Sequence, residues 1–510
     1  MTESKPLFTS KWVLTALLAI IFALGLIVRL YDFKAAPLDF NPTRQLHSAL
    51  MARGMYYQTT NTIPEAQRAL GIELGKAEGV IELPVMEWLT ATAYRLAGHE
   101  ILWIARLYSI FFWMLGSIAM FLLSRELTSS ERPNQWGGAL VGFAYFLILP
   151  FGILASRAFQ PDPLMTSVII WALWALVRWQ RTPTWKWTIT AGVLGGLAIL
   201  FKAVAVFFIG GAWIGLILAD QGLLKALRNR QVWLFGVLTV LPYGSYHIYG
   251  VYINGFLASQ MSLRFFPEMW KDPLFYLRWN GEIASTVGFE WFLLAIFGCL
   301  ALRNKSHRGM FLGLLVGYFI YGMSLSHHIS THDYYQDPLI PVVALGLAVG
   351  GDAVLRALKG PRALIYVLTA GVLIYALTIK AWDARVAIKR NNHDSEIPIW
   401  QELGKKFNPS ENIIGLTSDY GYRLAYYGGV RTAQWMTSAD FNYRAMNGET
   451  FDMKALFQQQ VEGKDYFVVT MFGELDKQPA LKSMLNSQYA VLAQTGDYLI
   501  YDLHHPLKTP

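Results

Sequence analysis

The chain contains repeated long apolar stretches, separated by short connections that carry much of its charge. The first, residues 12–30, is about as long as a bilayer-crossing helix, and no small-residue cleavage site follows it. We count about eleven such stretches before residue 382. Only 15% of the residues are charged, whereas soluble domains carry about 25%. The sequence therefore predicts a multi-span membrane protein in which residues 12–30 are a retained signal anchor.

The connections alternate between basic and nearly uncharged. By the positive-inside rule the basic set is cytoplasmic, together with the N-terminus, and the other set faces outward in a plasma (inner) membrane protein. The net charge of +8 is then a consequence of topology, and nucleic-acid binding is excluded. The polar residues without a topological role gather on the outer face. The clearest basic connections contain Arg178, Arg181 and Lys186; Lys225, Arg228 and Arg230; and Arg303, Lys305 and Arg308.

The composition becomes that of a soluble domain after residue 381. Alternating and apolar runs predict strands and helices of a small α/β domain there. We expect two domains, residues 1–381 in the membrane, with a first outer loop at 31–101 that carries surface helices, and residues 382–510 outside it. The expected strands are 412–417, 466–470 and 498–503, and the expected helices are 396–406 and 478–486.

A polar segment at residues 31–57 follows the first apolar stretch. Asn41-Pro42 predicts a helix start and Gly54 predicts its end. The helix between them is amphipathic, with Arg44 on a face away from its apolar side. Asp39 precedes this helix and is either a solvated loop carboxylate or a general base that takes a proton from a hydroxyl.

Two ionisable residues lie at the outer ends of predicted spans. Asp162 precedes Pro163 and can be a helix N-cap, part of a site at the membrane edge, or both. Lys202 interrupts an apolar run and is either a lysine that snorkels to the interface or a cation held for a phosphate.

One short outer turn is rich in histidine. It favours hydrogen bonding to phosphate or sugar hydroxyls, and a divalent metal stays an alternative, although no zinc signature is present. Asp337-Pro338 follows the turn, and we expect Asp337 to be the N-cap of the next helix. The candidate metal ligands are His327, His328, His332 and Asp333.

Taken together, these motifs resemble the GT-C superfamily of integral-membrane glycosyltransferases, and in particular the family of aminoarabinose-lipid A transferase and the protein O-mannosyltransferases. The resemblance covers about residues 10–380. The motifs that carry it are Arg29, Pro37 and Ala52-Arg53; Glu82-Leu83-Pro84 with Trp88, Gly98 and Ala105-Arg106; Asp162-Pro163; Phe201-Lys202; and His332-Asp333-Tyr334-Tyr335 with Pro338.

The resemblance implies an inverting transferase that moves a sugar from a polyprenyl-phosphate donor to an acceptor hydroxyl of a lipid, glycan or protein. Asp39 would be the base and Asp162 a supporting carboxylate. The donor phosphate would be held by Arg44, Lys202, His332 and Tyr335, and Arg53, Arg106 and Glu82 would support the surface helices. No nucleotide or organic cofactor is implied, and the chain has no Gly-rich phosphate loop.

The first loop departs from the family pattern. Relatives carry an acidic pair where this chain has Thr43-Arg44-Gln45. Either Asp39 takes the role of base, or Asp162 does, or catalysis is lost and the chain only binds a lipid carrier or a partner. Leu83 stands where relatives often have a phosphate-binding lysine, for which Arg44 or Lys76 would compensate. A transporter of lipid-linked solutes is a further alternative, but it predicts ionisable groups near the midplane and matched broken halves, which the sequence lacks.

Overall fold

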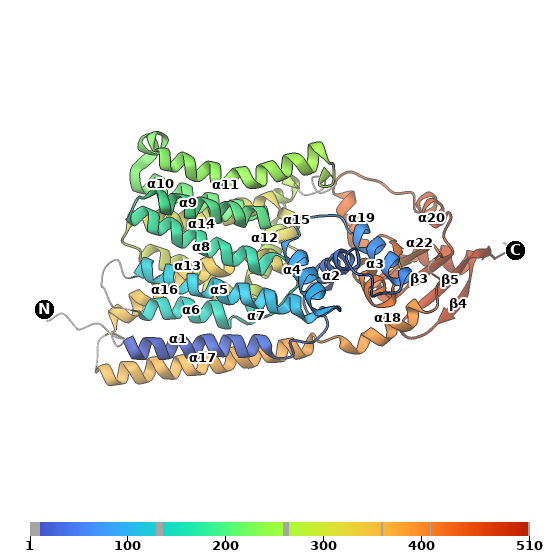
Figure 1. Ribbon diagram of the computed structural model, residues 1–510, viewed down its shortest axis with the longest axis horizontal. Coiled ribbons are helices and arrows are strands. Elements are labelled where there is room, and N and C mark those ends of the chain that lie inside the picture. The colour runs from blue at the N-terminus through green and yellow to red at the C-terminus, as the bar shows by residue number, and fades with distance from the viewer. Residues whose placement is uncertain (1–10, 129–135, 259–264, 359–360, 409, 508–510) are drawn as a thin grey trace. The chain divides into compact units, whose positions relative to one another are not determined.

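A bundle of long helices makes up most of the residues between 11 and 391 in the computed structural model of the chain (Figure 1). The structure describes residues 11–128, 136–258, 265–358, 361–408 and 410–507. Their contacts divide the chain into two units. Unit 1 comprises Met1–Lys34, Val80–Met86 and Trp103–Asn391, and unit 2 comprises Ala35–Gly79, Glu87–Leu102 and Asn392–Pro510.

Unit 1 is helical, and its apolar side chains form one large core with smaller clusters beside it. α1 and α17 run side by side, as Figure 1 shows. The helices and turns of unit 1 are α1 (Lys11–Leu30), α5 (Trp103–Thr128), α6 (Gly137–Ile148), α7 (Pro150–Ala155), α8 (Asp162–Arg181), α9 (Trp185–Phe201), α10 (Ala205–Arg228), α11 (Arg230–Ile248), η1 (Tyr249–Ile253), η3 (Pro267–Lys271), α12 (Pro273–Thr286), α13 (Phe289–Leu300), α14 (Lys305–Ser324), α15 (Ser326–Ile329), η4 (Asp333–Gln336), α16 (Leu339–Ala357) and α17 (Arg362–Arg390).

Glycines bring α10 and α14 into close contact. Gly211 and Gly215 of α10 face Gly309, Gly313 and Gly317 of α14, so that backbone lies against backbone. A Cβ on Gly313 would lie 2.0 Å from the Gly211 carbonyl oxygen, and one on Gly211 would lie 2.2 Å from that of Gly313. Small residues allow this approach, which is a common way for helices to associate in membranes.

Among the described residues, five helical stretches are long and apolar enough to cross a membrane, or six if the bent pair α12 and α13 is one span. The five are α1, α5, α10, α16 and the stretch Leu364–Gly404 that contains most of α17. The prediction of about eleven spans is not confirmed. α6 and α9 are apolar but have only 12 and 17 residues, below the roughly 20 that a straight crossing needs.

The first loop contains three helices, α2 (Pro42–Tyr57), α3 (Glu65–Ala77) and α4 (Val85–Ala97). α2 begins where Asn41-Pro42 predicts, but Gly54 does not end it. Gly54 instead lies against α3, where a Cβ would be 3.0 Å from the Gly75 Cα. The predicted stop at Gly54 was therefore wrong, because this glycine serves helix packing.

Unit 2 also contains a five-stranded sheet with the order β2-β1-β3-β5-β4. β1 is parallel to β2 and β3, whereas β5 is antiparallel to β3 and β4. The three predicted strands and two predicted helices are confirmed within a few residues. The elements are η5 (Asp394–Glu396), α18 (Ile397–Gly404), β1 (Ile413–Leu416), η6 (Ser418–Gly421), η7 (Leu424–Gly428), β2 (Thr432–Gln434), α19 (Ser438–Ala445), α20 (Met453–Val461), β3 (Tyr466–Val469), α21 (Phe472–Asp476), α22 (Pro479–Gln488), β4 (Tyr489–Gln494) and β5 (Leu499–Pro506).

Candidate active site

Asp162 and Lys202 form a buried ion pair in unit 1. Asp162 is the first residue of α8, and Lys202 ends α9 in an extended conformation. The Lys202 Nζ donates to both carboxylate oxygens of Asp162, at 2.7 and 2.9 Å. The two side chains are 9% and 2% exposed. A simple N-cap does not describe Asp162, because the N-cap of α8 is Pro161. A snorkelling lysine does not describe Lys202, because its side chain is buried.

Two tyrosines of η4 flank the ammonium group. The Lys202 Nζ lies 5.1 Å from the ring centre of Tyr334 and 5.6 Å from that of Tyr335. Tyr335 stacks on Tyr321 of α14, with ring centres 6.2 Å apart. Aromatic faces attract cations, so Lys202 sits between a carboxylate and aromatic rings. Tyr335 was predicted for this site and Tyr334 was not.

A chain of buried hydrogen bonds holds η4 in place. The Trp279 indole donates to the Tyr318 hydroxyl at 2.7 Å, and this hydroxyl donates to the Gln336 Oε1 at 2.6 Å. The Gln336 amide then donates to the Ile329 carbonyl at 3.0 Å. Gln336 is fully buried, and its side chain ties η4 to α14 and to the Ile329 carbonyl.

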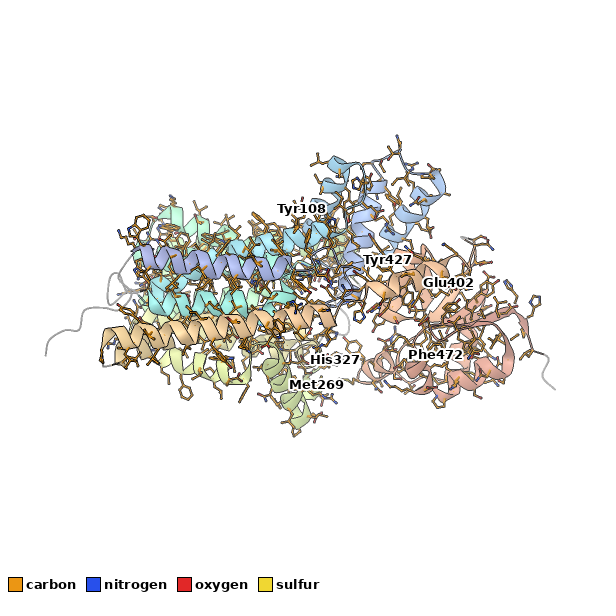
Figure 2. All side chains as sticks on the ribbon, turned by 90° about the horizontal axis from the view of Figure 1, so that it is seen from below. Tyr108, Met269, His327, Glu402, Tyr427 and Phe472 are labelled. Carbon is orange, nitrogen blue, oxygen red and sulfur yellow. The ribbon has the colours of Figure 1, made fainter. Side chains whose placement is uncertain are left out.

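The histidines lie in and after α15, which packs against η3; Figure 2 labels His327 of α15 and Met269 of η3. The rings of His328 and His332 stack 5.7 Å apart, and His328 also lies 5.2 Å from the Tyr335 ring. Burial lowers the pKa of His327 to about 4 and also lowers that of His332. At neutral pH the rings of His327 and His332 are uncharged and can serve as hydrogen-bond partners.

The metal alternative gains no support from the geometry. Within residues 11–128, 136–258, 265–358, 361–408 and 410–507, no group of three or more His, Cys, Asp and Glu side chains is placed to hold a metal ion. His332 Nδ1 lies 2.8 Å from the Thr331 hydroxyl.

The prediction that Asp337 is an N-cap was wrong. Its side chain is fully buried and bonds to no helix N–H. The residue that caps α16 is Pro338. Sequence reasoning could have noticed only that Asp337 follows the tyrosine motif in the same turn.

Asp39 belongs to unit 2 and is 6% exposed. The Gln45 amide donates to Asp39 Oδ1 at 3.3 Å and to the Phe40 carbonyl at 2.6 Å. Gln45 is one of the residues that replace the family's acidic pair, so the amide and Asp39 lie together. Asn41, between them, has a left-handed φ of 45°, which turns the chain into α2.

Arg44 and Arg53 also lie in unit 2, on α2. Arg44 is half-buried and acts electrostatically on Tyr422. Arg53 pairs with Glu100 at 3.0 Å, donates to the Tyr426 carbonyl at 2.8 Å and lies 3.7 Å from the Tyr426 ring centre. Arg53 thus joins the first loop to η7, which is consistent with a supporting role.

Arg106 and Glu82 lie in unit 1. Arg106 is buried in α5. Glu82 is half-buried and acts electrostatically on Tyr246 of α11.

Two buried arginines near the site were missed as structural elements. Arg157 donates to the carbonyls of Arg29, Tyr31 and Asp32, at 2.6, 2.5 and 3.1 Å, and so caps the end of α1. Arg29 donates to the Ser156 hydroxyl at 2.7 Å and to the Leu147 carbonyl at 2.7 Å. The turn that leads to Asp162 is therefore tied to the start of the first loop.

Polar side chains also pair away from the Asp162–Lys202 site. A second polar cluster lies at the opposite ends of α8 and α10, where Glu126 pairs with Arg178 and Arg181. Beside it Asp220 accepts from Gln180 and from Ser306, at 2.8 and 2.9 Å. These bonds join four helices, and no pattern in the sequence predicted their pairing.

A comparison with family models matches residues 82–249 to the model for dolichyl-phosphate-mannose-protein mannosyltransferase. A comparison with curated protein sequences found no significant match. Several solved structures are similar. ArnT from Cupriavidus metallidurans bound to undecaprenyl phosphate aligns with a TM-score of 0.60 and 16% identity, over 96% of this chain and 97% of that one.

Two further structures show the same fold at lower identity. AglB, the oligosaccharyltransferase of Archaeoglobus fulgidus, in complex with an inhibitory peptide and a dolichol-phosphate has a TM-score of 0.52 and 13% identity, over 96% of this chain and 74% of its own. Mycobacterial arabinofuranosyltransferase AftD has a TM-score of 0.52 and 15% identity, over 98% and 42%. The chain shares its fold with these structures, and the resemblance to the GT-C superfamily seen in the sequence is confirmed.

Proposed function

We propose that the chain is an inverting glycosyltransferase that moves a sugar from a polyprenyl-phosphate donor to an acceptor hydroxyl on the outer side of the inner membrane. The observation that carries this proposal is the Asp162–Lys202 pair, a buried cation beside a carboxylate at one end of the helical bundle. An ammonium group held in low dielectric binds a phosphate far more strongly than one in water.

The similar structures support the choice of donor. ArnT is bound to undecaprenyl phosphate and AglB to dolichol-phosphate, both of them polyprenyl phosphates. A lipid-linked donor brings its phosphate to the edge of the bilayer, so a phosphate site belongs at the end of a spanning bundle.

The reaction needs no covalent intermediate. The acceptor hydroxyl attacks the anomeric carbon, the bond from that carbon to the phosphate oxygen breaks, and the hydroxyl proton passes to a carboxylate. We assign that carboxylate to Asp39 and a supporting role toward the acceptor to Asp162. Arg44 and Lys202 would stabilise the charge of the departing phosphate, whereas His332 and Tyr335 would donate hydrogen bonds to it. Supporting roles fall to Arg53, Arg106 and Glu82.

The test is release of free polyprenyl phosphate when purified protein is incubated with polyprenyl-phosphate sugars and a mixture of acceptors. Asp39→Asn should abolish release while leaving the unfolding transition unchanged. The control is Asp497→Asn, at an exposed position, and this variant should release lipid phosphate as the wild type does. Full release by Asp39→Asn would contradict the assignment of the base. Lipid binding without release by the wild type would instead show a non-catalytic binding protein.

A further inference from the structure

Asp337 is a buried acid with no hydrogen-bond partner. Its residue is 0% exposed, and neither carboxyl oxygen has a partner among the residues that the structure describes. The hydrogen bonds of Gln336 hold the backbone before it, and the Ile340 N–H binds its carbonyl at 3.2 Å. The Asp337 side chain is thus buried on a segment whose backbone is held by these hydrogen bonds.

Lys202 lies beside the rings of Tyr334 and Tyr335, and the Asp337 N–H donates to the Tyr334 carbonyl at 3.2 Å. The Asp162–Lys202 pair is therefore near Asp337, but it does not neutralise the Asp337 carboxyl group. Lys202 already donates to both oxygens of Asp162. Burial, and then the carboxylate of Asp162, raise the pKa of Asp337 well above its usual range, and Lys202 only partly opposes them. An unpaired buried carboxylate costs several kcal/mol or more, so such a group stays protonated. Charged and titratable groups surround Asp337 on four elements. They are Asp162 on α8, Lys202 at the end of α9, Asp333, Tyr334 and Tyr335 on η4, and Tyr321 on α14.

We propose that Asp337 is the third member of the Asp162–Lys202 site, a neutral carboxylic acid whose proton keeps the site open to an anionic phosphate. Asp337 is in this view a positioning residue that sets the charge of the site. The inference rests on the proposed binding of a lipid phosphate by Lys202.

Charge counting gives the expected pH dependence. With Asp337 protonated, Lys202 and Asp162 together carry no net charge, and the ammonium can turn to a phosphate. As the pH rises through the raised pKa, Asp337 ionises and the site gains one negative charge. A nearby like charge in an effective dielectric of about 20 opposes anion binding by more than a factor of ten. Phosphate affinity should therefore be high at low pH and fall as the pH rises.

The probe should have a charge that does not change with pH. The methyl ester of undecaprenyl phosphate is a phosphodiester with one negative charge throughout the range used, and undecaprenol is its uncharged counterpart. For the full-length wild type in detergent, we expect affinity for the ester to fall by about tenfold or more on raising the pH from about 6 to about 9. Affinity for undecaprenol should not change.

Two variants separate the possibilities. Asp337→Asn is neutral at every pH and nearly the same shape, so it should bind the ester as the wild type does at pH 6 and keep that affinity at pH 9. The exposed Asp497→Asn is the control, because Asp497 is not among the groups around Asp337, and it should keep the wild-type pH profile. An Asp337→Asn profile that falls with pH as the wild type does, or binding lost at all pH values by a folded Asp337→Asn, would overturn the inference.

The variant Lys202→Met distinguishes an error in the role of Asp337 from an error in the proposed function. If Lys202→Met binds the ester as the wild type does, no phosphate binds at Lys202 and the proposed site itself is wrong. If Lys202→Met loses binding while Asp337→Asn keeps the pH profile of the wild type, only the role of Asp337 is wrong.

A measurement on the wild type alone covers the case in which Asp337→Asn does not fold. At pH 9 binding of the ester should take up a proton, because Asp337 must be neutral in the complex. Calorimetry in buffers of different ionisation enthalpy measures that uptake. Binding at pH 9 with no proton uptake would contradict the inference.

Discussion

A buried ion pair such as Asp162–Lys202 is weak evidence for stability, because both charges lose their hydration. The proposed phosphate ligand would account for an ion pair whose Lys202 and Asp162 side chains are only 9% and 2% exposed. The ion pair allows a prediction about the free energy of unfolding, because removal of either side chain leaves the other charge buried and unpaired.

Lys202→Met should lower the free energy of unfolding by about 3–5 kcal/mol, and the double variant Asp162→Leu/Lys202→Met should lose less. Thermal unfolding in detergent measures both. The control is Lys271→Met, which breaks the exposed pair with Glu268 and should change stability by less than about 1 kcal/mol. Equal effects of Lys202→Met and Lys271→Met would contradict the buried pair.

Glu78 in unit 2 gives a prediction about pH. Its side chain is 11% exposed and lies 3.8 Å from His47, and burial raises its pKa to about 7 from an ordinary 4.5, although a hydrogen bond with Tyr422 and the charge of Arg431 oppose the rise. A carboxyl group whose pKa is higher in the folded than in the unfolded protein adds most to the free energy of unfolding below its ordinary pKa. That contribution is lost as the pH rises to the folded-state pKa.

Stability of the wild type should therefore fall between about pH 4.5 and pH 7 by an amount on the order of 3 kcal/mol from this group. Glu78→Gln, which can still accept from Tyr422, should remove that part of the slope. Unfolding midpoints of the two proteins, measured across this range, give the comparison. Parallel curves would show that Glu78 is not protonated in the folded protein.

Single residues also show where sequence reasoning stops. Asp162, Lys202 and Tyr335 were found because charged groups in apolar surroundings stand out and match a family pattern. Asp337 was missed because Asp-Pro before a helix is the usual sign of an N-cap, and only the burial of its oxygens distinguishes the two cases. The bonds of Arg157 to the end of α1 join residues more than 120 positions apart, which no local pattern predicts.

Among the helices, the packing of α10 on α14 depends on glycine at particular positions. A Cβ on Gly211 would meet the carbonyl oxygen of Gly313, whereas a Cβ on Gly210, its neighbour on α10, would have no atom within 4 Å. Adjacent glycines in one helix therefore have opposite roles, a difference that hydropathy alone cannot give.

Gly211→Ala should destabilise the protein by about 1–3 kcal/mol, because the two backbones must move apart. Gly210→Ala is the matched control and should be neutral or stabilising by up to about 1 kcal/mol, since alanine favours the helix. Thermal unfolding in detergent reports both. A Gly211→Ala protein as stable as Gly210→Ala would show that the two helices do not touch there.

The lengths of the apolar stretches predicted most helices of unit 1, but they did not predict how many of these helices cross the membrane. α6 ends after 12 residues and α7 begins at Pro150, so one apolar run of the sequence becomes two short helices. Proline lacks the N–H that would continue the first helix. The strands of the sheet were predicted where they are buried, as in β1 and β3, and missed in β2 and β4, which are largely exposed.

For the molecule as a whole, the grouping of the first loop differs from the expected domains. Residues 35–79 and 87–102 belong with 392–510, because side chains such as Arg53 reach 373 positions along the chain to Tyr426. Because the loop follows the first apolar stretch in the sequence, we expected it to belong with the membrane helices. Only hydrogen bonds between residues far apart in the sequence show that it groups with residues 392–510. The candidate residues are correspondingly divided, with Asp162 and Lys202 in unit 1 and Asp39 and Arg44 in unit 2.

The most direct test of the proposed function is an experimental structure of the protein with a polyprenyl-phosphate sugar bound. We expect the donor phosphate within about 4 Å of the Lys202 Nζ, with Tyr335 beside it and a carboxylate, Asp39 by our assignment, facing the anomeric carbon. A donor phosphate bound away from Lys202, with the Asp162–Lys202 pair intact and no carboxylate near the anomeric carbon, would contradict the proposal.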